Sequence, residues 1–298
     1  MDTKNLIPLL AMPLLLLSVE IGAVLLTLPV QVSGIVAFAN PTDVYNPIIF
    51  IVILLVFTAL LLVLIKYDMK KVIAAVIGIS IFLTFVYIFM AIVYAVTGET
   101  NAAAVIVLIL SILATVLLYK FPEWYIIDAL GILIGAGVAA IFGASLDIVP
   151  VLILLILLAV YDAISVYKTK HMITLAEGVI GQRTPILFVI PKRRDYSFIR
   201  EGLGKLAEGG ERAAFIIGMG DMIMPAILVV SANVFVKGWR LAGLINLPAI
   251  GAIIGSLGGL YVLLHFVMSG KPQAGLPPLC GGTILGFLAG WGLSTMMV

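Results

Sequence analysis

Charged side chains are scarce in this chain of 298 residues. Only 11% of the residues are charged, whereas 63% are hydrophobic, and a soluble domain carries roughly 25% charged residues. Apolar runs of about 20 residues recur along the whole chain, and each is long enough to cross a bilayer core of about 30 Å. The composition therefore indicates an all-α polytopic membrane protein without a separate soluble catalytic domain.

Cysteine and histidine are also rare. The single cysteine, Cys280, excludes an intramolecular disulfide. The two histidines, His171 and His265, lack a Gly-x-Ser-x-Gly sequence nearby, which argues against a serine intramembrane protease. A His-Glu-x-x-His sequence is absent too, which argues against a membrane metalloprotease. We therefore expect neither a metal nor a cofactor.

The apolar runs predict nine membrane spans. In chain order they cover residues 7–32, 47–66, 72–97, 102–119, 124–145, 148–167, 212–233, 241–268 and 276–296. Short connections make neighbouring helices antiparallel, and the polar stretch 168–211 is the one long exception. We therefore expect an N-terminal six-helix region over residues 1–167, a loop over 168–211 and a C-terminal three-helix region over 212–298.

Lysine and arginine predict the orientation of these spans, because both are enriched in cytoplasmic loops. If the N-terminus is cytoplasmic, 15 of the 17 Lys and Arg residues lie on the cytoplasmic side, and only Lys237 and Arg240 lie outside. More than half of the 15 belong to the 168–211 loop. We therefore expect a cytoplasmic N-terminus, a cytoplasmic loop and an external C-terminus in the cell membrane.

Three carboxylates fall well inside the predicted spans: Glu20, Asp162 and Asp221. An ionisable group at membrane depth is costly, and it is a functional candidate by default. At a rise of 1.5 Å per residue, Asp162 lies roughly 8 Å and Asp221 roughly 14 Å from the cytoplasmic ends of two consecutive antiparallel spans. The two aspartates can therefore face each other. For Glu20 we expect a structural pairing, and for Asp128, near a span end, hydration at the interface.

Two facing carboxyl groups support two kinds of function. In a site of low dielectric constant one group keeps its proton while the other is charged. Such a pair can hold a water, so that one group takes its proton and the other polarises a peptide carbonyl. Buried acids also relay protons or ions in transporters. From depth alone, an aspartyl protease and a proton-coupled transporter are equally supported.

The sequence around the two aspartates favours the protease. Tyr161-Asp162 and the sequence Gly-Met-Gly-Asp at 218–221 resemble the YD and GxGD motifs of the presenilin and signal peptide peptidase family of intramembrane aspartyl proteases. The joint occurrence on spans six and seven of nine, on either side of a long loop, is far more specific than either motif alone. A transporter is disfavoured because its usual inverted repeats are not visible in a six-plus-three division.

The resemblance covers the full span plan and is closest to the archaeal single-chain members. It implies a presenilin-like fold and catalysis by Asp162 and Asp221. It also implies transmembrane peptide or protein substrates, including signal peptides, inside the lipid bilayer and no nucleic-acid partner. The enzyme acts either alone or as a homo-oligomer.

The glycines of the second motif also have a physical interpretation. Gly218 and Gly220 weaken a helix directly before Asp221, and they permit close approach of another backbone. Both effects would allow an extended substrate to lie beside Asp221, in contact with the motif residues Gly218, Met219 and Gly220. Close packing between membrane helices is the alternative role. Tyr161 either donates a hydrogen bond near the aspartates or packs against a neighbouring helix.

The third motif of the family is Pro-Ala-Leu at the start of span nine. The matching segment reads Pro277-Pro278-Leu279, so proline replaces the alanine. The similar sequence Pro-Ala-Ile at 248–250 lies inside span eight. Because consecutive prolines do not easily start a regular helix, we expect them to keep the chain extended near the active site.

The long loop contains the apolar run 186–190, bounded by Pro185 and Pro191. The run predicts a short strand or an interfacial segment, and the alternative is a solvated loop that only sets the topology. A membrane helix must unwind before its peptide bonds can be hydrolysed. An exposed backbone edge in this loop, or just before Gly218, is therefore a candidate to bind the unwound substrate by β-augmentation.

Overall fold

The computed structural model of the protein describes residues 3–169, 187–193, 195–202, 214–267 and 273–296. The long helices are α1 (Thr3–Ser33), α2 (Asn46–Lys66), α3 (Lys70–Thr97), α4 (Asn101–Lys120), α5 (Trp124–Ser145), α6 (Ile148–Ile164), α9 (Met219–Phe235), α10 (Leu247–Val267) and α11 (Leu276–Met296). Within these ranges eight helices are long and apolar enough to cross a membrane, and α9 is a shorter apolar helix. The predicted all-α protein with about nine spans is confirmed.

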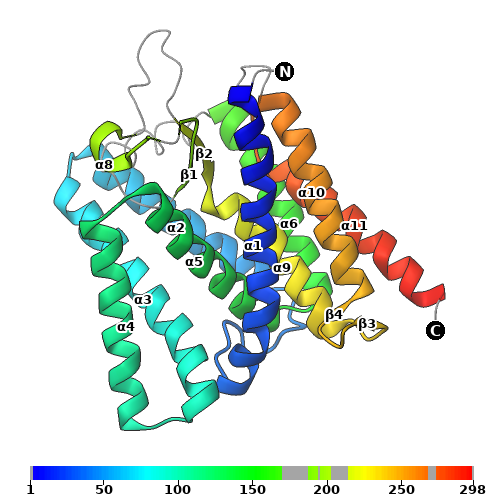
Figure 1. The fold of residues 1–298 in the computed structure, drawn as a ribbon. Coiled ribbons are helices and arrows are strands. Elements are labelled where there is room, and N and C mark those ends of the chain that lie inside the picture. Colours follow the sequence, from blue (N-terminus) through cyan, green and yellow to red (C-terminus); the bar gives the residue numbers. More distant parts are fainter. Residues whose placement is uncertain (1–2, 170–186, 194, 203–213, 268–272, 297–298) are drawn as a thin grey trace.

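Short elements connect these helices. They are the π-helical turn η1 (Ser165–Thr169), β1 (Leu187–Pro191), α8 (Phe198–Glu201), β2 (Ala214–Gly218), β3 (Arg240–Leu241) and β4 (Ile245–Asn246). β1 pairs with β2, and β3 pairs with β4, both antiparallel. The β1–β2 sheet lies at the end of the bundle where α1 begins, and β3 and β4 lie toward the opposite end (Figure 1).

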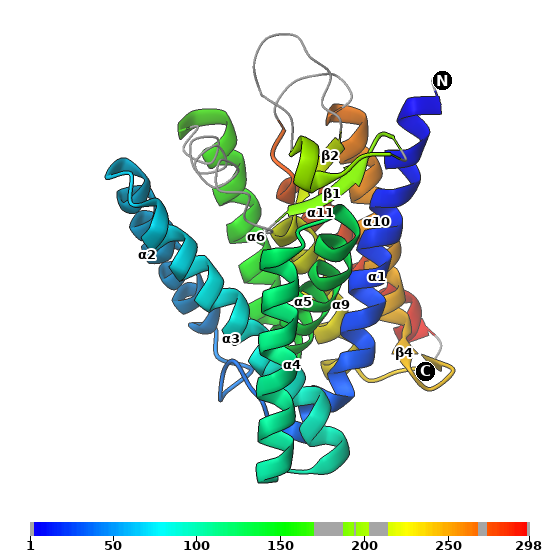
Figure 2. The same cartoon turned by 60° about the vertical axis from the view of Figure 1, so that its left-hand side comes forward.

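The apolar run of the long loop is a strand rather than a solvated segment. Phe188, Val189 and Ile190 are buried, and β1 lies against the bundle, where it contacts α5 and α1 (Figure 2). The predicted strand is thus confirmed over 187–190, whereas residues 170–186 and 203–211 of the predicted loop lie outside the described residues.

The predicted start of span seven at residue 212 is wrong. A strand occupies Ala214–Gly218, and α9 begins only at Met219. The sequence Phe-Ile-Ile at 215–217 suits a strand, and pairing with β1 satisfies its backbone, so an apolar segment at this position need not be helical. As a consequence, Asp221 lies in the first turn of α9 instead of deep within a span.

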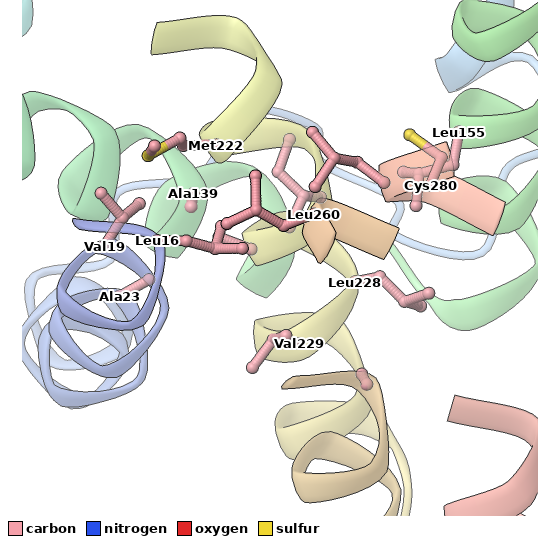
Figure 3. Close-up of a cluster of buried hydrophobic side chains, with 14 of the residues drawn as sticks. Leu16, Val19, Ala23, Ala139, Leu155, Met222, Leu228, Val229, Leu260 and Cys280 are labelled. Carbon is pink, nitrogen blue, oxygen red and sulfur yellow. The ribbon is translucent and has the colours of Figure 1, made fainter. Parts of the chain in front are cut away.

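Helix α9 is the centre of the molecule. Its residues are buried without a break from Pro225 to Asn233, and it contacts α1, α5, α6, α10 and α11. Figure 3 shows side chains of this core, with Met222 and Leu228 of α9 among residues from the helices around it. The helix that carries Asp221 is therefore held from many sides.

Helices α10 and α11 approach at backbone distance. Glycines on α10 face glycines on α11, and a Cβ added at Gly255 would collide with the backbone of Gly282 and Gly286. Small residues allow such close packing where lipid surrounds the helices. The start of α11 is consequently fixed against α10, since a Cβ at Gly259 would meet the backbone of Pro278.

Glu20 does not make the expected pairing among the described residues. Its side chain is fully buried in α1, and neither carboxyl oxygen has a hydrogen-bond partner there. Ser256 of α10 lies beside it, but the Ser256 hydroxyl donates to the carbonyl of Ile253 at 2.8 Å. Burial of an unpartnered polar group costs free energy of folding.

Asp128 has a protein hydrogen-bond partner that its position near a span end did not predict. The side chain is buried in α5 with 8% of its surface exposed. Its Oδ1 accepts a hydrogen bond of 2.8 Å from the backbone N–H of Val189 in β1. The strand therefore supplies a partner to one of the two carboxyl oxygens.

Candidate active site

Asp162 lies near the end of α6, where the helix passes into the turn η1. Its side chain is buried, and its Oδ2 accepts a hydrogen bond of 3.0 Å from the backbone N–H of Leu276. Leu276 is the first residue of α11, and an N–H in the first turn of a helix has no partner within that helix. The positive end of the α11 dipole also favours a carboxylate at this place.

Asp221 reaches the same place from the first turn of α9. A Cβ added at Gly275 would lie 2.8 Å from Oδ2 and 3.0 Å from Cγ of Asp221, so the carboxyl group packs directly on the Gly275 backbone. The carboxyl groups of Asp162 and Asp221 are also close enough to interact electrostatically. The structure therefore brings the two predicted aspartates together at the backbone of residues 275–276.

Gly275 was not identified from the sequence. It precedes the Leu-Pro-Pro-Leu sequence at 276–279, and a glycine directly before this motif was the only available signal. Its role depends on the packing of Asp221, which comes from a helix more than 50 residues earlier in the chain. Such a contact is invisible to periodicity and to hydropathy.

The glycines of the GxGD sequence occupy two different environments. Gly218 ends β2 and is the N-cap of α9 in an extended conformation, so it lies before the helix instead of weakening it. Gly220 is exposed, and a Cβ added there would meet no described atom within 4 Å. Open space therefore adjoins Gly220, the residue before Asp221, whereas Met219 is buried against α5.

The Pro277-Pro278-Leu279 segment is helical, and the expected extended conformation is wrong. α11 begins at Leu276, which places both prolines in its first turn. Proline is tolerated there because its missing N–H would have no helical partner and its φ is already helical. Leu279 is buried. The Pro-Ala-Ile sequence at 248–250 lies at the start of α10, next to β4.

The segment before α11 is fixed by a tyrosine that no sequence motif indicated. The Tyr167 hydroxyl, in η1, donates to Oε1 of Gln273 at 2.8 Å and accepts from the N–H of Ala274 at 3.4 Å. Tyr161, which the motif singled out, is partly buried on α6. The end of α6 therefore contacts the 273–276 segment through both Asp162 and Tyr167.

The β1–β2 sheet leads directly into this site. Its register pairs Val189 with Ile216. In an antiparallel ladder, alternate residue pairs direct their N–H and C=O groups away from the partner strand. Because the Val189 N–H points to Asp128, Ile216 must direct its own N–H and C=O toward the outer edge of β2. That edge lies five residues before Asp221.

The described residues contain no group of three or more His, Cys, Asp or Glu side chains that could hold a metal ion. Cys280, one turn into α11, is buried near both aspartates. The described groups that meet at this site are two carboxyl groups and the backbone of 275–276, with open space beside Gly220.

Comparison with known proteins identifies the family. The family described as signal-peptide peptidase, presenilin aspartyl protease matches residues 12–296. A solved structure of a presenilin family intramembrane aspartate protease in space group C222 is 50% identical, with a TM-score of 0.72, covering 96% of this chain and 99% of that chain.

A second structure, of a presenilin family intramembrane aspartate protease in space group P2, is 51% identical. Its TM-score is 0.70, and the match covers 96% of this chain and 98% of that chain. The comparison with curated proteins gave no match. The presenilin-like fold is thereby confirmed, and the transporter alternative is not favoured. The chain belongs to the signal-peptide peptidase and presenilin aspartyl protease family, and it is an intramembrane aspartyl protease.

Proposed function

We propose that Asp162 and Asp221 are the catalytic pair of this protease. The observation that carries the proposal is the convergence of both carboxyl groups on the backbone of residues 275–276, through the Leu276 hydrogen bond and the Gly275 contact. The two aspartates come from α6 and α9. The N-terminal six-helix region and the C-terminal three-helix region thus each supply one acid.

In the proposed mechanism, one carboxyl group is ionised and the other keeps its proton. A water between them gives its proton to the ionised group while its oxygen attacks the scissile carbonyl carbon. The protonated group donates a hydrogen bond to the carbonyl oxygen. Protonation of the amide nitrogen then releases the amine and the carboxylic acid.

The substrates are transmembrane segments of peptides or proteins, including signal peptides. We propose that the unwound substrate adds as a strand to the outer edge of β2, where the N–H and C=O of Ile216 point outward. The open side of Gly220 leaves room for that strand to continue past Asp221. Pro277, Pro278 and Leu279, at the start of α11, line the same region in this proposal.

The proposed orientation has the N-terminus and the 168–211 segment in the cytoplasm and the C-terminus outside. The count of 15 of 17 Lys and Arg on the cytoplasmic side supports it. Since α6 packs against α9, and α9 directly follows β2, both aspartates then lie at the cytoplasmic side. The enzyme acts as a single chain or as a homo-oligomer.

Cleavage of a single-span substrate in reconstituted vesicles tests the catalytic pair. Asp162→Asn and Asp221→Asn are each expected to abolish cleavage. The matched control is Asp147→Asn, which alters the carboxylate that caps α6 at its other end and should leave cleavage measurable. Cleavage that survives either active-site change, or proton flux without any proteolysis, would sink the proposal.

Proline substitution tests the proposed substrate edge. Ile216→Pro removes the outward N–H but none of the ladder hydrogen bonds to β1, and it should reduce cleavage about tenfold or more. Ile216→Val keeps the N–H and the strand propensity, so it serves as the control. Equal cleavage by the two variants would show that substrate does not bind this edge.

A further inference from the structure

A third buried carboxylate, Asp128, lies close to the site. It lies one turn into α5, and its Oδ1 accepts one hydrogen bond, from the backbone N–H of Val189. An acidic side chain at this depth is costly. A buried strand N–H without an acceptor is costly as well. The carboxyl group of Asp128 and the N–H of Val189 therefore provide each other with a hydrogen-bond partner, although they are 61 residues apart in the chain.

The same face of α5 holds a second contact with the site. A Cβ added at Gly131, one turn after Asp128, would lie 3.0 Å from Phe188 and 2.9 Å from Met219. Phe188 belongs to β1, and Met219 lies two residues before Asp221. One face of α5 therefore contacts both β1, through Asp128 and Gly131, and the first residue of α9, through Gly131.

The Asp128 hydrogen bond also makes the two edges of the sheet unequal. A two-stranded sheet has two edges, and each presents unpaired backbone groups. Asp128 occupies the Val189 N–H on the β1 edge, which leaves Ile216 on the β2 edge to accept an incoming strand. An isolated pair of strands is only marginally stable. The hydrogen bond to Asp128 therefore helps to hold the two-stranded sheet in place against α5.

We infer that Asp128 is a positioning residue of this protease, which fixes the β1–β2 sheet so that the β2 edge can bind the substrate strand beside Asp221. The inference rests on the proposed docking of substrate at β2. The contact uses Asp128 as a hydrogen-bond acceptor, and Asp128 makes no salt bridge among the described residues. It touches neither the reacting atoms nor the substrate, and its effect passes through Val189.

A neighbouring acid has a different task. Glu123, just before α5, accepts hydrogen bonds from the Ser197 hydroxyl at 2.7 Å and the Phe198 N–H at 3.1 Å. Both donors belong to the start of α8, beyond β1 in the chain. Glu123 therefore holds the connection after the sheet, whereas Asp128 accepts a hydrogen bond from the strand itself.

The test measures kcat and KM for a reconstituted single-span substrate with Asp128→Leu and Asp128→Asn. Leucine has room, because a cavity of about 660 Å³ bounded by α1, α5 and β1 adjoins this side chain. Loss of the acceptor should raise KM roughly tenfold with kcat nearly unchanged. Asparagine keeps an acceptor oxygen, so it should restore KM to within about twofold of the original enzyme.

Val189→Pro supplies an independent variant, because it removes the donor of the same hydrogen bond. It should raise KM to a similar degree, and the double variant with Asp128→Leu should be no worse than either single change. The control is Asp43→Leu, which removes a carboxylate that also accepts one backbone N–H, that of Tyr45 at 2.9 Å, far from the sheet in the chain.

Three results would overturn the inference: unchanged KM in Asp128→Leu, equal losses in the leucine and asparagine variants, or additive effects of Asp128→Leu and Val189→Pro. Failure of the catalytic proposal is separate, because it appears as cleavage that survives Asp162→Asn or Asp221→Asn. A loss of kcat that accompanies a lower unfolding temperature in all Asp128 and Val189 variants also counts against a positioning role.

Discussion

At the scale of single residues, Gly275 shows how little space the two aspartates leave. A Cβ at this position would lie 2.8 Å from the end of the Asp221 side chain. Because the end of a side chain can rotate away, Gly275→Ala should fold with nearly the original unfolding temperature. The rotated carboxyl group would be misplaced by about 1 Å, which costs roughly a hundredfold in rate.

The measurement for Gly275→Ala combines a cleavage rate with a thermal unfolding curve. Gly281→Ala is the control on the neighbouring helix α11, since a Cβ there would meet no described atom within 4 Å. Full activity of Gly275→Ala would mean that Asp221 does not need the position it has in this structure.

Glu20 is a second residue whose removal has a predictable sign. The buried carboxyl group has no hydrogen-bond partner among the described residues, so Glu20→Met should stabilise the protein by roughly 1–3 kcal/mol. Glu20→Gln keeps a polar group in the same place and should give little gain. Thermal unfolding in detergent distinguishes them, and a lower midpoint for Glu20→Met would contradict the prediction.

Sequence information was sufficient at this scale to single out the two aspartates that meet at the candidate site. Asp162 and Asp221 stood out because ionisable groups are rare inside apolar runs. Gly275, Tyr167 and the partner of Asp128 did not stand out. Their roles come from contacts between segments far apart in the chain, which no local pattern records.

At the scale of elements, the α10–α11 pair is the least tolerant of added volume. A Cβ at Gly255 would collide with backbone atoms of Gly282 and Gly286, and backbone cannot rotate away as a side chain can. Gly255→Ala should therefore push the helices apart and destabilise the protein by about 1–3 kcal/mol. Gly258→Ala, with open space around the added Cβ, should be neutral.

Thermal unfolding of the two α10 variants checks this prediction directly. An unfolding midpoint of Gly255→Ala equal to that of Gly258→Ala would show that α10 and α11 can accommodate an added methyl group between them. Cleavage should fall along with stability in Gly255→Ala, since α11 supplies the Leu276 N–H to Asp162.

At this scale, hydropathy predicted the ends of an element correctly only where the whole apolar run forms one helix. The predicted span 276–296 coincides with α11. The predicted span 212–233 failed at its start, because 214–218 is equally apolar but pairs with β1. The conformation of Pro277 and Pro278 was also mispredicted, since a proline in a first turn costs no hydrogen bond.

At the scale of the whole molecule, packing is uneven. α9 has an unbroken buried run from Pro225 to Asn233, whereas only 11% of the apolar window of α2 is buried. α2 lies at the side of the bundle in Figure 2. With α3 and α5 it borders an apolar cavity of about 670 Å³. α2 should therefore move more than α10 and α11 do.

Distance measurements between spin labels test this difference. One pair joins the exposed positions Val56 on α2 and Val160 on α6, and the other joins Ile254 on α10 and Leu285 on α11. The native Cys280 is first replaced by alanine. The α2–α6 distance distribution should be clearly broader, and equal widths would contradict the prediction.

The number and order of the helices were predictable from the chain, since each apolar run must be long enough to cross a bilayer. The central position of α9 was not predictable. It is among the shortest of the long helices, and its burial depends on five neighbours whose arrangement is a property of the complete bundle.

The outward-facing backbone of Ile216 has a consequence for selectivity. N–H and C=O groups are the same in every residue except proline, so an edge of this kind carries almost no preference for particular side chains. Substrates would then be ranked by how readily their helices unwind, and a helix-weakening residue near the scissile bond would act as the recognition signal. The local stability of the substrate helix, and not a sequence motif, would then determine which substrates are cleaved.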